Sequence, residues 1–154
     1  MKVNTKSIGV IDIDEVDDGI ETLSIKELLK YWNPFLAWFE LKGVAIAQEE
    51  VLECLKKGEE ELVFTEIFFS GEYVSDEIAA EARRNHIKKI AYFVKHGVND
   101  AIDVEFLEND NIAVNDGNHR LCAKVIRGET EIESFLGGFI DFAYDNNLVI
   151  ESVK

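Results

Sequence analysis

The spacing of apolar and polar residues along this chain switches between the period of helices and the alternation of strands. The longest helical pattern follows Ser75 and Asp76, which are residue types that cap helix starts well. Its apolar positions are Ile87, Ile90, Ala91 and Val94. Because these recur every three or four residues, the sequence predicts a helix from Glu77 to about Lys95 that buries this stripe.

Two further patterns precede this helix near the start of the chain. Residues 8–13 alternate between apolar and acidic side chains near the end of the segment, which predicts an edge strand. A turn at residues 17–19 is expected to follow it. Ser24 is followed three residues later by Glu27, which is the spacing of a capping box. We therefore expect a helix that continues through Tyr31.

Asn33 and Pro34 predict a second helix that runs to about Leu41, since proline loses nothing at a first helical position. Large apolar residues recur in this region at helical spacing: Trp32, Phe35, Leu36 and Phe39. Such a stripe is typical of a core or of a packing surface for a second copy, rather than a platform for stacking bases.

The middle of the chain contains one clear helix and one ambiguous apolar run. Residues 48–57 predict a helix that Gly58 ends. Residues 62–69 are mostly apolar, and their periodicity fits either a strand or a buried helix.

Strand and helix patterns follow one another in the last third of the chain. Residues 102–107 and 112–115 predict two strands joined by a turn at residues 108–111. A helix then buries Leu121, Cys122, Val125 and Ile126 and ends at Gly128. With 154 residues and 47% hydrophobic content, the chain is predicted to form a single α+β domain, in which a helical region of residues 1–80 packs on residues 81–154.

The turn between the last predicted strand and helix has the composition of an anion site. It reads Asp116-Gly117-Asn118-His119-Arg120. Unpaired N–H groups and the positive end of the helix dipole attract anions at such a turn. Asp116 or Asn118 is expected to cap the helix, while His119 and Arg120 supply donors suited to phosphate.

Other basic residues lie within reach of this predicted site. Arg120, Lys124 and Arg127 fall on one face of the helix, where they either extend the anion site or form an ordinary solvated face. His86 lies at the margin of the long helix's buried stripe, where it either packs in the core or contacts the ligand.

Residues 83–136 resemble the ParB/sulfiredoxin superfamily. The resemblance is carried by residues 86–97, by Ala101-Ile102-Asp103-Val104, and by the Asp-Gly-x-His-Arg turn with Ala123 three positions past its arginine. It implies a small mixed sheet packed with helices. It further implies that the turn binds the phosphates of ATP, ADP or CTP through Gly117, His119 and Arg120. Besides these residues, we expect Asn118, Lys124 and His86 to contact the ligand.

An enzyme of this kind is expected to transfer or hydrolyse a phosphoryl group. His119, Arg120 and Asp116 are then the candidate catalytic residues, with Asp116 as base or ligand of a Mg²⁺ ion that arrives with the nucleotide. No motif for a metal site of the protein's own is present in the sequence. Sulfiredoxins carry a cysteine where this chain has Asn118, which argues against sulfinate reduction.

Charge separates the remaining hypotheses. The formal net charge is −15, and residues 1–80 contribute −11 of it, from 7 Lys against 18 acidic residues. This charge argues against direct nucleic-acid binding and against nuclease action. In addition, residues 137–154 are expected to be too few for the DNA-binding helix-turn-helix of partition proteins. The rival hypothesis is a non-enzymatic regulatory protein whose acidic half engages a protein partner.

Localisation follows from what the sequence lacks. Cys54 and Cys122 form no Cys-x-x-Cys pattern and are expected to be free thiols in a reducing compartment. The N-terminal residues have no apolar signal core, and no apolar run approaches the ~20 residues of a membrane span. The sequence therefore predicts a cytoplasmic protein.

Overall fold

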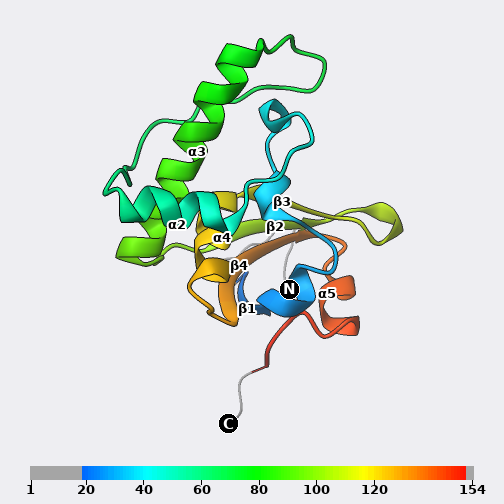
Figure 1. Ribbon diagram of the computed structural model, residues 1–154. Coiled ribbons are helices and arrows are strands. Elements are labelled where there is room, and N and C mark those ends of the chain that lie inside the picture. Colours follow the sequence, from blue (N-terminus) through cyan, green and yellow to red (C-terminus); the bar gives the residue numbers. More distant parts are fainter. Residues whose placement is uncertain (1–18, 152–154) are drawn as a thin grey trace.

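A four-stranded sheet and a layer of helices make up the computed structural model, which describes residues 19–151 (Figure 1). The strands are β1 (Ile20–Ser24), β2 (Ile102–Phe106), β3 (Ile112–Asp116) and β4 (Glu131–Gly138). The α-helices are α1 (Ile25–Leu28), α2 (Gln48–Lys56), α3 (Asp76–His96), α4 (Asn118–Ile126) and α5 (Asp141–Asp145). Short 3₁₀ turns are η2 (Pro34–Leu36), η3 (Phe39–Leu41) and η4 (Glu108–Asp110). The predicted α+β class is confirmed, whereas the predicted strand at residues 8–13 lies outside the described residues.

The sheet has the strand order β1-β4-β2-β3. The outer pairs β1–β4 and β2–β3 are antiparallel, while the central pair β2–β4 is parallel. A parallel pair needs a crossover, which β3 and α4 provide between β2 and β4. Since β1 comes from the first half of the chain, the two halves share one sheet.

One face of this sheet is buried and the other is open. Residues alternate along β2, where Ile102, Val104 and Phe106 are buried between an exposed Asp103 and a half-buried Glu105. This is the pattern of a strand with one face on a core. The buried face packs against α1, α4 and α5 in a first apolar cluster.

Helix α4 lies between two apolar clusters. Its Leu121 is fully buried in the first cluster, against the sheet. Its Cys122 is fully buried in a second cluster, together with residues of η3, α2 and α3. Both Cys54 and Cys122 are free thiols. Because α4 is held on both sides, the turn that precedes it is fixed relative to α3 as well as to the sheet.

Several predicted elements are confirmed at their ends. Ser24 accepts a hydrogen bond from the Glu27 amide at 3.2 Å and begins α1, although this helix stops at Leu28 rather than Tyr31. Ser75 accepts one from the Ile78 amide at 3.1 Å and begins α3. The predicted hairpin of β2 and β3 and the helix end at Gly128 are also present.

The predicted helix from Asn33 to Leu41 is wrong. Asn33 does cap a helical start, but η2 ends at Leu36, and Trp38 is extended with φ −112° and ψ 133° before η3 begins. The predicted aromatic core stripe is divided by this break, since Leu36 and Phe39 are 40% and 44% exposed. The break turns Trp38 and Glu40 towards α3, so a tertiary contact has overridden the helical pattern.

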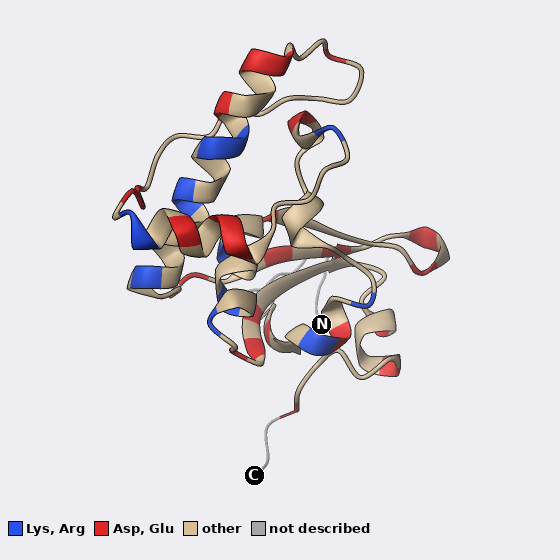
Figure 2. Cartoon of the chain, in the orientation of Figure 1, with Lys and Arg blue, Asp and Glu red and all other residues tan. Residues whose placement is uncertain are grey.

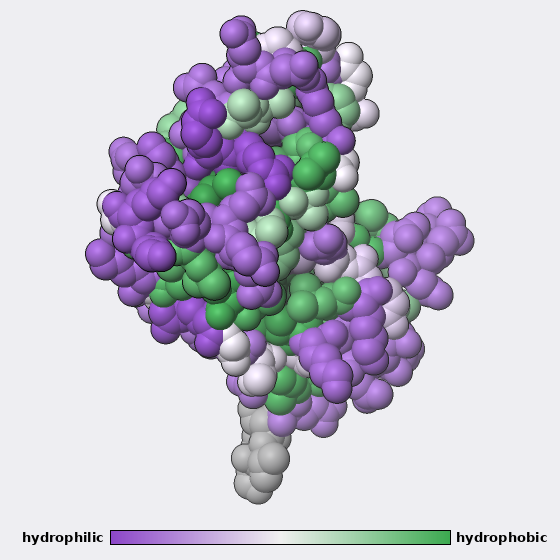
Figure 3. Space-filling view, viewed as in Figure 1, coloured by the Kyte–Doolittle hydropathy of each residue, from purple (hydrophilic) through white to green (hydrophobic). Residues whose placement is uncertain are grey.

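The predicted strand or buried helix at residues 62–69 is also wrong. This segment has no regular structure, and Phe64 and Ile67 are 83% and 72% exposed. Its apolar run therefore reflects neither burial nor strand pairing. Figure 3 shows apolar surface gathered in the middle of the face in view, with polar residues around it.

Charge is distributed unevenly over these elements. In Figure 2, α3 is acidic at its N-terminal end and carries its basic residues further along. These basic residues are Arg83, Arg84, Lys88, Lys89 and Lys95. Among residues 19–151, none of the helices has the length and apolar character that crossing a membrane would require.

Candidate functional site

The predicted anion turn joins β3 to α4, and its geometry requires glycine. β3 ends at Asp116, α4 begins at Asn118, and Gly117 between them has φ 100°. A Cβ atom on Gly117 would lie 2.3 Å from Ile102 Cγ2 and 2.9 Å from Arg120 Nη2. Both the left-handed backbone and the lack of space therefore exclude a larger residue.

Among residues 19–151, no side chain caps the start of α4, so the predicted capping by Asp116 or Asn118 is wrong. Gly117 occupies the N-cap position and has no side chain to offer. Asn118 Oδ1 accepts instead from Trp32 Nε1 at 2.8 Å, and Asn118 Nδ2 donates to the Val114 carbonyl at 2.9 Å. The amides of the first turn are thus left to solvent or to a ligand.

Arg120 is paired with acidic side chains and is not among the residues that line the cleft described below. Its Nη2 donates to Asp116 Oδ2 at 3.2 Å, and its Nη1 lies 3.8 Å from Asp100 Oδ2. The arginine side chain is 15% exposed, whereas the two carboxylates are 72% and 85% exposed. Arg120 therefore braces the turn by holding two acidic side chains beside it.

His119 and His86 lie side by side and join a buried carboxylate. His119 Nε2 is 2.8 Å from His86 Nδ1, and His86 Nε2 is hydrogen bonded to Glu40 Oε2. His86 and Glu40 are each 1% exposed. Three elements far apart in sequence, η3, α3 and α4, thus contribute to one chain of hydrogen bonds.

Trp38 covers both imidazole rings. Its ring centroid lies 4.1 Å from that of His86 and 4.4 Å from that of His119. The two imidazole centroids are only 5.0 Å apart, so both rings stack on the same face of the indole. The tryptophan therefore shields the pair from water on that side.

This environment keeps both histidines neutral. Burial lowers the pKa of His119 to about 2, and electrostatic interactions with His86, Lys89 and Arg120 act in the same direction. Burial also lowers the pKa of His86, although its bond to Glu40 opposes the shift. His119 is therefore a neutral imidazole at physiological pH rather than a cation.

A cleft of about 580 Å³ opens in front of the turn. Residues from four parts of the chain line it, among them Trp32, Trp38, Phe64, Phe68, His86, Lys89, Asp116, Gly117, Asn118 and His119. Burial lowers the pKa of Lys89, and Asp116 opposes this shift more strongly than Arg120 adds to it. Within residues 19–151, Lys89 forms no ion pair of 4 Å or less.

Lys124 lies away from this cleft, at the other end of α4. Its Nζ is 3.0 Å from Glu129 Oε1, and the Arg127 Nε is 2.6 Å from Glu129 Oε2. Two residues of the predicted basic stripe, Lys124 and Arg127, therefore pair with the same carboxylate, that of Glu129. Of the predicted residues, the structure brings Asp116, Gly117, Asn118, His119 and His86 to the cleft, while Arg120 supports the turn from behind.

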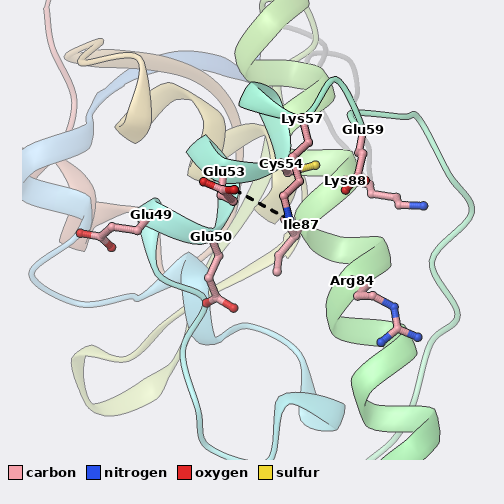
Figure 4. Close-up of a pocket in the computed structure, with 9 residues that line it drawn as sticks. All are labelled: Glu49, Glu50, Glu53, Cys54, Lys57, Glu59, Arg84, Ile87 and Lys88. Carbon is pink, nitrogen blue, oxygen red and sulfur yellow. Dashed lines mark ion pairs between the residues drawn. The ribbon is translucent and has the colours of Figure 1, made fainter.

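A second cavity, of about 490 Å³, lies between α2 and α3 (Figure 4). Its lining includes glutamates of α2 and basic residues of α3, and Glu53 of α2 pairs with Lys57, the residue that follows the helix. None of the residues that the sequence singled out for ligand binding lines this cavity. Across the described part of the chain, no group of three or more His, Cys, Asp or Glu side chains is placed to hold a metal ion.

The sequence pattern did not single out Glu40 or Trp38. The sequence did contain one indication that Glu40 is unusual, because it is the only charged residue between Tyr31 and Leu41 in a mostly apolar stretch. A lone acid there has either to remain in water or to find a partner. Comparison with known proteins adds no assignment, since no family model, curated protein or solved structure matches this chain.

Proposed function

We propose that the cleft in front of α4 binds a nucleotide or another phosphorylated small molecule, with a phosphate on the first turn of the helix. The observation that carries this proposal is the uncapped start of α4, which opens onto a cleft large enough for such a ligand. Free backbone amides and the helix dipole favour an anion at this position. The cleft volume lies within the range of small-molecule sites.

Lys89 supplies the cation that this site needs. It lines the same cleft, and no carboxylate within residues 19–151 is paired with it. An unpaired, partly buried ammonium group gains more from a ligand phosphate than one already held in an ion pair. In this arrangement Lys89 takes the part that the sequence suggested for Arg120 and Lys124.

Aromatic residues on the cleft wall support a nucleotide as the ligand. Trp32, Trp38, Phe64 and Phe68 all contribute to the lining. Aromatic rings suit the flat face of a base, and stacking of this kind tolerates adenine and cytosine alike. This supports ATP, ADP or CTP as the first ligands to test.

We further propose that the chain is a ParB/sulfiredoxin-like protein and that it transfers or hydrolyses a phosphoryl group. The order of β2, β3, turn, α4 and β4 supports this relationship. Mg²⁺ would arrive with the nucleotide, and Asp116 fits as its protein ligand, because Mg²⁺ commonly takes one carboxylate besides phosphate oxygens. The metal would neutralise charge on the transferring phosphate.

Isothermal calorimetry with ATP, ADP and CTP, each with and without Mg²⁺, tests the proposal. We expect a Kd of about 1 mM or tighter for at least one nucleotide, and a weakening of ~10-fold or more in Lys89→Ala, because a desolvated charge pair is lost. Lys88→Ala is the matched control, since Lys88 immediately precedes Lys89 in α3 but lines the cavity between α2 and α3. Absence of heat with every nucleotide would refute the proposal.

A non-enzymatic interaction protein is the second candidate, and one surface favours it. Apolar side chains of the segment after α2 are unusually exposed: Leu62, Phe64, Ile67, Phe69 and Tyr73. Contiguous apolar surface often marks a protein interface. A stoichiometric protein partner that co-purifies with the chain, together with no nucleotide binding, would favour this candidate over the first.

A further inference from the structure

We propose that Glu40, His86 and His119 form a proton relay that removes the proton from a water molecule or hydroxyl group bound in the cleft. This inference rests on the proposed function, because the activated oxygen would attack the bound phosphoryl group. It assigns a role to Glu40, and it gives His86 and His119 a role different from direct phosphate contact.

The relay is an unbroken chain of hydrogen bonds with one open end. Glu40 Oε2 meets His86 Nε2, and His86 Nδ1 lies 2.8 Å from His119 Nε2. The remaining ring nitrogen, His119 Nδ1, forms no hydrogen bond within residues 19–151 and is not one of the buried unpartnered atoms there. His119 lines the cleft, so this nitrogen is the end of the relay that a ligand can reach.

The relay requires one arrangement of protons along this chain. Glu40 must be the acceptor, so His86 donates to it through Nε2–H. The neutral His86 then accepts at Nδ1, and His119 must donate through Nε2–H. Consequently His119 Nδ1 carries a lone pair, which is what a general base needs.

The proton transfer leaves both imidazoles neutral. The ligand O–H bond breaks, and its proton forms a bond to His119 Nδ1. The Nε2 proton of His119 passes to His86 Nδ1, and the Nε2 proton of His86 passes to the Glu40 carboxylate. The electron pair of the O–H bond goes to phosphorus, and the electrons of the broken phosphoanhydride bond remain on the departing nucleotide oxygen.

A relay accounts for what His119 alone cannot do. Burial lowers its pKa to about 2, with further contributions from His86, Lys89 and Arg120, so an isolated His119 would hold an added proton poorly. Passing a proton onward to Glu40 neutralises a buried negative charge instead of creating a positive one. The charged groups around the pair thus favour the relay over a lone base.

The other acidic residue at the turn is less suited to this task. Asp116 is 72% exposed, and its Oδ2 already accepts a hydrogen bond from Arg120 at 3.2 Å. A structural role for the buried Glu40 would require only one partner, which His86 already supplies. His119 extends the hydrogen-bond network from His86 to the cleft. A purely structural role for Glu40 would not need this extension.

Nuclear magnetic resonance of the full chain labelled with ¹⁵N-histidine tests the proton positions directly. The chain has three histidines, and the exposed His96 is an internal reference. We expect the proton on Nε2 and a bare Nδ1 in both His86 and His119 at pH 7. A proton on Nδ1 of His119 would overturn the proposal, and this measurement needs no variant.

Phosphate release from whichever of ATP, ADP or CTP binds tests the transfer. In Glu40→Gln, which keeps a hydrogen-bonding group but cannot take a proton, we expect release to fall ~100-fold or more with little change in Kd. Glu49→Gln, in the other cavity, is the control and should match the wild type. Binding with equal release from Glu40→Gln and wild type would overturn the relay alone, whereas no binding at all would overturn the proposed function and the transfer with it.

Discussion

The two ends of α4 differ in how their polar groups are used. At the C-terminal end, Lys124 and Arg127 both pair with Glu129, and Gly128 closes the helix. At the N-terminal end, no side chain of the described part of the chain caps the helix, and the turn opens onto the cleft. At the C-terminal end the charged groups are thus paired with one another. At the N-terminal end the first-turn amides, His119 Nδ1 and the nearby Lys89 ammonium group have no such partner within residues 19–151.

This difference shows where function is to be sought in the molecule. Polar groups that are already paired contribute to stability and have little left for a ligand. The cavity between α2 and α3 has charged groups of both signs in its lining, and Glu53 and Lys57 form an ion pair there (Figure 4). The cleft in front of α4 contains the open end of that helix.

The largest expected effect concerns the glycines at the two ends. Gly117→Ala should cost about 2–5 kcal/mol of unfolding free energy, from left-handed strain and overlap with Ile102. Gly128→Ala, with φ 75° and open space around it, should cost only ~1–2 kcal/mol from backbone strain. Urea denaturation of both variants measures the difference. Equal losses would contradict the tight packing of the turn.

The second effect is a pH dependence of stability that originates at the open end. An unfolded histidine has its ordinary pKa near 6.5, whereas burial lowers the pKa of His119 to about 2 in the folded state. As the pH falls below 6.5, only the unfolded chain gains a proton, so stability is lost. Between pH 7.5 and 5.5 the loss from His119 should be about 1.4 kcal/mol.

Variants separate this contribution from other titrating groups. His119→Asn should remove about that much of the pH dependence in urea denaturation, and His96→Asn, at an exposed position, is the matched control. The same slope in wild type and His119→Asn would show that His119 is not buried in its neutral form.

A smaller effect is expected from the hydrogen bond that occupies Asn118. Trp32→Phe keeps an aromatic ring but removes the donor to Asn118 Oδ1, at a cost of ~1 kcal/mol. The freed Asn118 side chain could then cap α4 and compete with a ligand for its amides. Thermal unfolding and nucleotide titration of this variant measure both consequences, and unchanged stability with unchanged affinity would contradict this role of Trp32.

The smallest effect is expected at the closed end. Glu129→Gln weakens two ion pairs whose groups are partly exposed, so it should cost only ~0.5–1 kcal/mol. Nucleotide affinity should stay at the wild-type value. If calorimetry showed weaker binding in this variant, the separation between the two ends of α4 would not hold.

The sequence predicted the C-terminal half of the fold well, because its elements are defined by local signals. Ser75, Gly117 and Gly128 mark helix ends through side-chain caps and left-handed backbone, which depend on neighbouring residues only. The segment from 62 to 69 could not be predicted in this way. Its apolar residues suggested a regular element, yet they remain exposed.

The site was predicted in part, for the same reason. The turn from Asp116 to Arg120 is local, and its position before a helix is readable in the sequence. Glu40 and His86 are 46 residues apart, and only the break in the predicted helix at Trp38 brings them together. Likewise, the sequence does not show that Arg120 pairs with both Asp116 and Asp100, or that Lys89 rather than Arg120 lines the cleft.

A crystal structure of the chain grown with the nucleotide that binds most tightly is the most direct test of the central claim. The account predicts a phosphate group within hydrogen-bonding distance of the first-turn amides of α4 and of Lys89 Nζ. A nucleotide bound instead in the cavity between α2 and α3, or a phosphate held at Lys124 and Arg127, would contradict it.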